Sequence, residues 1–118
     1  MIADDSDAIR MVLKDVLEIE HHELVAQATN GIEAVVNFNA TKPDLLLLDL
    51  AMPKKDGLDA LKEIMAANPN AKIVMITASD NLKTMQECLA AGALAYILKP
   101  FDFDEVLKII AKALDKHL

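Results

Sequence analysis

Apolar residues are spaced in two ways along the chain. In some segments they recur every three or four positions, as in a helix that buries one face, and in others they form short unbroken runs, as in buried strands. The helical spacing covers Ser6 to about Glu20, Ile32 to before Pro43, Leu58 to before Asn68, about Asn81 to Ala91, and Phe103 to Leu114. The short apolar runs are Met1–Ala3, Leu24–Ala28, Leu45–Leu48, Ile73–Ile76 and Ala95–Leu98.

The order of these segments predicts an α/β fold. Predicted strands and helices alternate along the whole chain, and the runs Leu45–Leu48 and Ile73–Ile76 are apolar throughout. Strands without polar alternation are buried on both faces, which is typical of parallel sheets covered by helices on both sides. We therefore expect residues 1–118 to form one domain, with an open, doubly wound, five-stranded parallel sheet.

Composition limits the class of protein. The 118 residues are 53% hydrophobic, which suffices for one core, and three Gly and four Pro are too few for a linker or a collagen-like chain. No apolar run approaches the length of a membrane span, and there is no signal-peptide pattern. The net charge of −7 opposes direct binding to nucleic acid. The single cysteine, Cys88, excludes an internal disulfide and fits a cytoplasmic protein.

Five polar residues stand where predicted strands end. Asp4 and Asp5 follow the first strand, Asp49 follows the third, Thr77 ends the fourth and Lys99 ends the fifth. The carboxyl ends of parallel strands meet at one rim of a sheet, so these side chains are expected to converge there. Carboxylates held together must take up protons or bind a cation. Oxygen ligands without His or Cys favour Mg²⁺ over zinc.

This set of groups suits phosphoryl transfer. A metal ion, an ammonium group and a hydroxyl group together stabilise the charge on the oxygens of a phosphoryl group during its transfer. One carboxylate would then act as the nucleophile and form an aspartyl-phosphate. Asp49 is the best candidate because it stands alone after the most buried strand, whereas Asp4 and Asp5 are paired in the manner of metal ligands.

The chain resembles the receiver domain of bacterial and archaeal two-component response regulators, close to the single-domain chemotaxis type. This resemblance implies a flavodoxin-like sheet with strand order 2-1-3-4-5. It covers essentially the whole chain, and the motifs in combination are far more specific than any one of them. The motifs are Asp4-Asp5-Ser6, the segment 47–53 with Gly57 beyond it, Ile76-Thr77-Ala78, and the segment 96–101.

The resemblance also implies roles for single residues. Asp49 would accept a phosphoryl group from the phosphohistidine of a histidine kinase or phosphotransfer protein. Asp5, Asp49 and the backbone carbonyl of Ala51 would bind Mg²⁺ directly, and Asp4 would act through water. Lys99 would contact a phosphoryl oxygen, and its bond to the following proline would be cis.

The same resemblance implies a switch. Thr77 would move toward the phosphoryl group, and Tyr96 would rotate inward into the vacated space. The surface formed by the fourth helix, the fifth strand and the fifth helix, roughly 81–114, would then bind a downstream protein. The chain would not be an enzyme in the usual sense, since it would catalyse only its own phosphorylation and dephosphorylation.

Two departures from the family pattern stand out. Only Met1-Ile2-Ala3 precede Asp4, so we expect a short or truncated first strand. Such a strand would affect the metal site most, because it places Asp4 and Asp5. Ala51 and Ser79, each two residues beyond a site residue, are small at positions that tune the lifetime of the phosphoryl group in this family.

Three other functions remain open. A phosphatase of the haloacid dehalogenase type also uses Asp, Thr, Lys and Mg²⁺, but it usually has a second Asp where this chain has Ala51. A receiver-like domain that binds partners without phosphorylation is a second possibility. A third is the receiver part of a larger transcriptional regulator, although the chain shows no output domain before its end. His21, His22 and His117 are expected on the surface, without the further ligands that a metal site needs.

Overall fold

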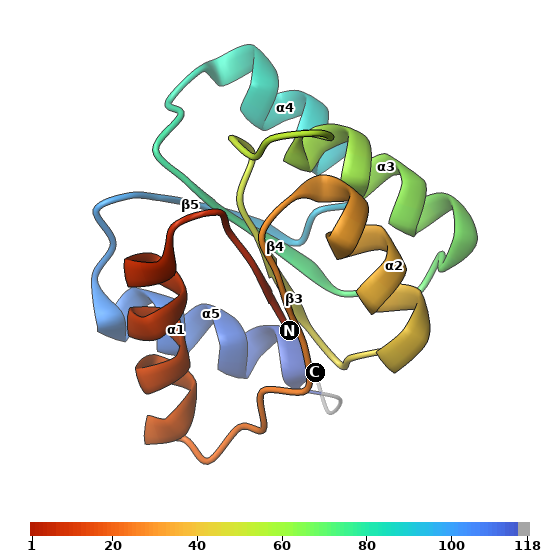
Figure 1. Ribbon diagram of the computed structural model, residues 1–118. Coiled ribbons are helices and arrows are strands. Elements are labelled where there is room, and N and C mark those ends of the chain that lie inside the picture. The colour runs from red at the N-terminus through yellow and green to blue at the C-terminus, as the bar shows by residue number, and fades with distance from the viewer. Residues whose placement is uncertain (116–118) are drawn as a thin grey trace.

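The computed structural model describes residues 1–115; residues 116–118, which include His117, lie outside the described part. Strands and helices alternate along the chain (Figure 1). In order, the elements are β1 (Ile2–Ala3), α1 (Asp7–Ile19), β2 (Gln27–Ala28), α2 (Gly31–Thr41), β3 (Leu46–Leu48), α3 (Gly57–Ala67), β4 (Ile73–Thr77), α4 (Leu82–Ala90), β5 (Ala95–Leu98) and α5 (Phe103–Leu114).

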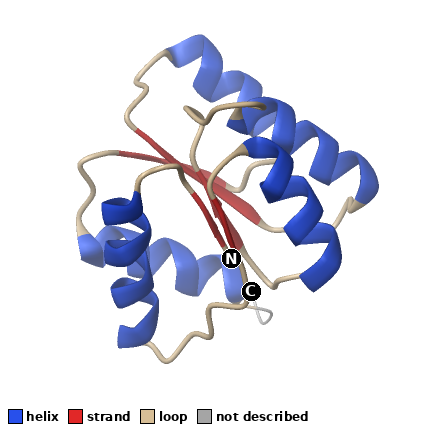
Figure 2. Cartoon of the chain, in the orientation of Figure 1, coloured by secondary structure: helices blue, strands red, loops and turns tan. Residues whose placement is uncertain are grey.

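The strands form one parallel sheet in the order β2-β1-β3-β4-β5, which confirms the predicted fold. Helices cover both faces of this sheet (Figure 2): α1 and α5 lie on one side, and α2, α3 and α4 lie on the other. The order reverses at β1, which pairs with β2 on one side and with β3 on the other. In such sheets, ligands bind at the carboxyl ends of the strands next to this reversal.

Alternate residues of the inner strands β1, β3 and β4 enter one of two apolar cores. In β3, Leu46 and Leu48 pack toward α2, α3 and α4, while Leu47 packs toward α1 and α5. Each of these three side chains is at most 2% exposed. A strand buried on both faces leaves no room for polar side chains, so the polar residues of the centre are confined to the strand ends.

The first strand is short but paired on both sides. The Met1 ammonium group donates to the Leu45 carbonyl at 2.9 Å, and the Leu47 N–H donates to the Met1 carbonyl at 2.9 Å. The apolar run expected as a strand over Leu24–Ala28 forms strand only at Gln27–Ala28. The reason is that β1 offers only two residues to pair with, and Leu24 instead packs against the core on the α1 and α5 side.

Every helix begins with a capping side chain that accepts a hydrogen bond from a backbone N–H of the first turn. Because each helix follows the carboxyl end of a strand, these capped ends surround the predicted site. The caps are Ser6, Asn30, Asp56, Asn81 and Asp102.

The helices differ in how many of their residues are buried against the sheet. Ile32 in α2 is 49% exposed, and the buried residues of this helix are Gly31, Ala34 and Phe38. Of the residues in α4, Cys88 alone is buried. Among the described residues, no helix is long and apolar enough to cross a membrane.

Candidate phosphorylation and metal site

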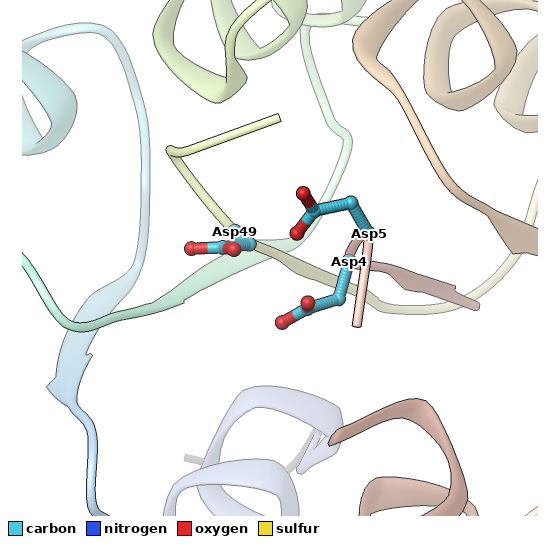
Figure 3. A group of neighbouring side chains, drawn as sticks. All are labelled: Asp4, Asp5 and Asp49. Carbon is cyan, nitrogen blue, oxygen red and sulfur yellow. The ribbon is translucent and has the colours of Figure 1, made fainter. Parts of the chain in front are cut away.

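Three carboxylates gather at the predicted rim. Figure 3 shows Asp4 and Asp5 after the end of β1 and Asp49 after the end of β3, with the carboxylate of Asp5 directed toward Asp49. One oxygen from each carboxylate lies within 4.8 Å of the others. Asp4 and Asp49 are 2% and 5% exposed, whereas Asp5 is exposed. The short first strand therefore still brings both of its aspartates to the site.

Asp4 is held at both carboxylate oxygens. One oxygen accepts a hydrogen bond from the Ser6 backbone N–H at 2.9 Å, and the other accepts from the Lys99 ammonium group at 2.7 Å. The Asp4 N–H donates to the Ala28 carbonyl of β2 at 3.0 Å. A buried carboxylate costs free energy unless it is hydrogen-bonded and paired with a cation, and Asp4 has both forms of support.

Lys99 bridges two of the carboxylates. Its Nζ atom lies 2.7 Å from Asp4 and 3.4 Å from Asp49, and its side chain is 16% exposed. The Lys99 N–H donates to the Thr77 carbonyl at 2.8 Å, which ties the end of β5 to the end of β4. The Lys99–Pro100 peptide bond is cis, as the family resemblance implied. The ammonium group therefore stands at the point where negative charge accumulates.

Burial disfavours the charged form of the Asp49 carboxyl group. Burial raises the pKa of its carboxyl group, the neighbouring Asp4 adds to this rise, and Lys99 acts in the opposite direction. Its N–H donates to the Ala3 carbonyl at 2.9 Å, so its backbone belongs to the rigid β1–β3 pairing. The hydroxyl-bearing Thr77, 1% exposed, stands at the end of the adjacent strand β4.

A cavity of about 390 Å³ opens beside Asp49. Small side chains form part of its wall, which leaves space for a group the size of a phosphoryl next to the carboxylate. Ala51 is exposed at the rim, and Thr84 lines the cavity from the first turn of α4. The residues that line the cavity include Asp49, Ala51, Thr77, Ser79, Thr84 and Lys99.

The loop after Asp49 is packed between two glycines. A Cβ atom on Gly57 would stand 2.0 Å from the Asp49 carbonyl oxygen, and one on Gly31 would stand 2.0 Å from the Lys55 carbonyl oxygen. Neither distance is compatible with a side chain. The Gly57 N–H donates to the Leu50 carbonyl at 2.8 Å. Glycine at these positions therefore lets α2 and α3 approach the loop that carries Asp49.

A chain of hydrogen bonds leads from Thr77 at the site to Tyr96 in β5. The Ser79 N–H donates to the Thr77 hydroxyl at 3.3 Å, and the Tyr96 hydroxyl donates to the Ser79 carbonyl at 2.7 Å. Tyr96 is half-buried, and burial raises the pKa of its hydroxyl, with the Ser79 bond acting in the opposite direction. The switch residues predicted from the sequence, Thr77 and Tyr96, thus lie on either side of Ser79.

All five polar residues predicted at strand ends meet at this rim. Sequence reasoning missed Arg10, whose guanidinium group contacts the Asp4 carbonyl at 2.8 Å. The available signal was its spacing of three residues from Asp7, which predicts a helix-surface ion pair and does not reveal the carbonyl partner. Thr84 was also missed, because nothing in its sequence context marks a cavity wall. Cys88 is buried in the core, in agreement with a packing role.

The donor set fits a hard divalent cation. Asp4, Asp5 and Asp49 offer carboxylate oxygens within reach of one ion, and the Ala51 backbone carbonyl lies on the adjoining loop. Oxygen-only sites of this kind suit Mg²⁺. Within residues 1–115 no other cluster of three or more His, Cys, Asp or Glu side chains could hold a metal ion.

Comparison with known proteins identifies the family of the chain. The sequence model of the response regulator receiver domain matches residues 1–111. The chain is 40% identical over 113 residues to the chemotaxis protein CheY of Listeria monocytogenes, covering 96% of this chain and 95% of the relative. It is 39% identical over 116 residues to the transcriptional regulatory protein PdtaR of Mycobacterium tuberculosis, of which it covers 56%.

Solved structures show the same fold. CheY in the CheX–CheY–BeF₃–Mg²⁺ complex of Borrelia burgdorferi superposes with a TM-score of 0.93 at 33% identity, covering 98% of this chain and 87% of that one. A CheY-like receiver domain protein of Methanospirillum hungatei gives a TM-score of 0.91 at 31% identity, with coverage of 98% and 91%. Both likenesses extend over nearly the full chain.

Proposed function

Since this chain belongs to the response regulator receiver domain family of two-component systems, we propose that it is a phosphorylation switch with Asp49 as its phospho-acceptor. The observation that carries the proposal is the position of Asp49. Its carboxylate is buried at the edge of an open cavity, 3.4 Å from the Lys99 ammonium group and in reach of two further carboxylates. No other carboxylate of the described chain combines these features.

Receiver domains bind Mg²⁺ at an acidic pocket, and the proposal includes this cofactor. Asp5, Asp49 and the Ala51 carbonyl would hold the ion directly, and Asp4 would act through water. When bound, Mg²⁺ neutralises charge on the carboxylates and on the phosphoryl oxygens. The carboxylates alone repel one another, and Lys99 balances only part of their charge.

The transfer step needs little from the protein beyond position and charge. A carboxylate oxygen of Asp49 attacks the phosphorus of a phosphohistidine on a histidine kinase or phosphotransfer protein. A P–O bond forms while the P–N bond breaks, and the departing imidazole keeps the electron pair and takes up a proton. The Lys99 ammonium group and the Thr77 hydroxyl donate to the phosphoryl oxygens. Attack by water on phosphorus later returns inorganic phosphate and the free carboxylate.

The signal leaves through the surface on α4, β5 and α5. Movement of Thr77 toward the phosphoryl group would change the contact of its hydroxyl with Ser79, to which Tyr96 is bonded. The surface presents large apolar side chains to a protein partner, whereas nucleic acid and membranes are not expected partners. The proposal also places the protein in the cytoplasm and assigns it no enzymatic activity on other substrates. The exposed apolar residues of the surface are Leu82, Leu89, Leu98 and Phe103.

The test is the mass of the intact protein after incubation with acetyl phosphate and Mg²⁺. The unmodified chain should gain one phosphoryl group, and Asp49→Asn should gain none. Asp80→Asn, which removes an exposed carboxylate near the same rim, should behave like the unmodified chain.

Three other results would contradict the proposal in different ways. No adduct on any variant would favour a receiver-like domain that works without phosphorylation. An adduct on Asp49→Asn would move the acceptor to another residue. Rapid hydrolysis of phosphomonoesters with no lasting adduct would favour a phosphatase.

A further inference from the structure

The Arg10 side chain ties the metal-binding loop to two other parts of the fold. From α1, its Nη1 atom donates to the Asp4 carbonyl at 2.8 Å, and its Nε atom donates to the Gln27 side chain of β2 at 3.2 Å. Its Nη2 atom pairs with the Asp7 carboxylate in the first turn of α1. The Arg10 side chain is 14% exposed and its contact with the Asp4 carbonyl is partly buried, whereas its contacts with Gln27 and Asp7 lie at the surface.

The Asp4 carbonyl belongs to the peptide group that links Asp4 to Asp5, the two neighbouring aspartates of the cation site. The other polar atoms of Asp4 are held by Ala28, Ser6 and Lys99. Arg10 supplies the partner for the remaining atom, the carbonyl oxygen. The peptide between Asp4 and Asp5 is thus fixed from the α1 side by one charged hydrogen bond, which is stronger than a neutral one.

Asp5 lacks such support of its own. The Asp5 side chain is exposed, and no group in residues 1–115 donates a hydrogen bond to its carboxylate. Asp4 and Asp49, by contrast, both accept from Lys99. The direction of the Asp5 side chain toward Asp49 therefore depends on the orientation of the preceding peptide (Figure 3). We propose that Arg10 is a positioning residue that fixes the Asp4–Asp5 peptide and so aims the Asp5 carboxylate into the cation site.

This inference rests on the proposed function, since it concerns the Mg²⁺ site of the same switch. It predicts an effect opposite in sign to that of charge alone. Arg10 is a cation near three carboxylates, so removing its charge would, by electrostatics, tighten Mg²⁺ binding. Loss of positioning would weaken Mg²⁺ binding instead, because partners that orient metal ligands typically contribute 10- to 100-fold in affinity.

The experiment measures the Mg²⁺ dissociation constant of the unphosphorylated protein by isothermal titration calorimetry. Arg10→Gln should weaken binding about tenfold. Lys14→Gln removes the same charge from an exposed position of the same helix and should change binding less than about twofold. Thermal unfolding of each variant establishes that it is folded.

A second variant keeps the test decisive if Arg10→Gln does not fold. Arg10→Lys keeps the charge but has a single ammonium group, which does not span both the Asp4 carbonyl and Gln27. It should bind Mg²⁺ about threefold more weakly than the unmodified chain. For either variant, phosphorylation of Asp49 by acetyl phosphate should need more Mg²⁺ but return to within about twofold of the normal rate at saturating Mg²⁺.

The outcomes separate the two proposals. Weaker Mg²⁺ binding in the Arg10 variants, with rescue by excess Mg²⁺, supports the positioning role. Unchanged or tighter binding in these variants overturns that role while leaving the phosphorylation switch intact. Failure of the unmodified chain to bind Mg²⁺ and to accept a phosphoryl group overturns the proposed function, and this inference falls with it.

Discussion

The centre of the sheet and its α4–β5 side are built differently. Every residue of β3 and β4 is buried, whereas β5 has a single buried residue, Ile97. On the helices, α3 buries a continuous stripe against the sheet, but α4 buries Cys88 alone among its residues. The carboxylate cluster stands on the densely packed centre (Figure 3), and the expected output surface stands on the thinly packed side.

Under the proposed function, this difference would allow one molecule to combine phosphorylation with signalling. Catalytic and metal-binding groups need fixed geometry, which buried strands provide. Elements with few buried contacts shift at low free-energy cost, and α4 is such an element. The contacts from Thr77 through Ser79 to Tyr96 join the two regions. Under the proposed function, phosphorylation of Asp49 would alter the α4–β5 side and leave in place the strands that hold the site.

The largest contrast should come from truncating a leucine in each region. Leu48→Ala in the centre, where the side chain is fully buried, should lower the free energy of unfolding by about 3 kcal/mol. Leu82→Ala in α4, where the side chain is 64% exposed, should change it by less than about 0.5 kcal/mol. Urea denaturation of both variants checks this. Similar losses in the two variants would refute the packing contrast.

A methyl group added at two glycines should also separate the regions. Gly57→Ala places a Cβ atom against the Asp49 backbone and should cost about 2 to 3 kcal/mol, with a displaced acceptor loop and slower phosphorylation. Gly92→Ala, after α4, places a Cβ atom against the flexible end of Met65 at a φ of +116° and should cost about 1 kcal/mol. Chemical denaturation and the rate of acetyl phosphate labelling measure both effects. A normal labelling rate in Gly57→Ala would contradict the tight packing inferred around Asp49.

Burial of the Met1 ammonium group at the centre of the sheet should make the stability of the fold depend on pH. Burial lowers the pKa of the Met1 ammonium group from 8.0 to about 6, with Asp44 acting in the opposite direction. Between these values the unfolded chain binds a proton that the folded chain does not, so stability should rise by about 2 kcal/mol from pH 6 to pH 8. Urea denaturation at several pH values measures this rise. Acetylation of the amino terminus should abolish it, and an unchanged slope would assign the effect to other groups.

A smaller loss of stability should come from removing the hydrogen bond between Tyr96 and Ser79, which links the two regions. Tyr96→Phe removes the hydroxyl that donates to the Ser79 carbonyl and should cost about 1 kcal/mol in stability. Phosphorylation of Asp49 should proceed within about twofold of the normal rate, because the hydroxyl does not contact the acceptor. Labelling kinetics measure this directly. A loss of labelling as severe as that of Asp49→Asn would place Tyr96 in the chemistry rather than in the link.

Much of this organisation could be predicted from the sequence. The apolar runs identify the central strands because a strand buried on both faces excludes polar residues. Asp4, Asp49 and Lys99 could be placed together because parallel strands end at one rim. Both inferences depend on periodicity and chain order, which are local properties of the sequence.

Other features depend on contacts between distant segments. The sequence pattern of the first helix predicts that Arg10 lies on its solvent-exposed face. The hydrogen bond from Arg10 to the Asp4 carbonyl depends on how α1 packs against the rest of the fold. The need for glycine at position 31 comes from the Lys55 carbonyl, which lies in another loop. The shortness of β2 follows from the length of its partner β1 rather than from its own residues.

Hydrogen–deuterium exchange on the fully phosphorylated protein shows whether phosphorylation of Asp49 reaches the α4–β5 side and spares the centre of the sheet. Exchange should be compared with and without acetyl phosphate and Mg²⁺, with Asp49→Asn as the control that receives the same reagents. We expect altered exchange in α4 and β5, unchanged protection in β3 and β4, and no phosphoryl-dependent change in Asp49→Asn. Altered exchange spread evenly over the sheet, or none at all in a protein whose mass shows a full complement of phosphoryl groups, would contradict this expectation.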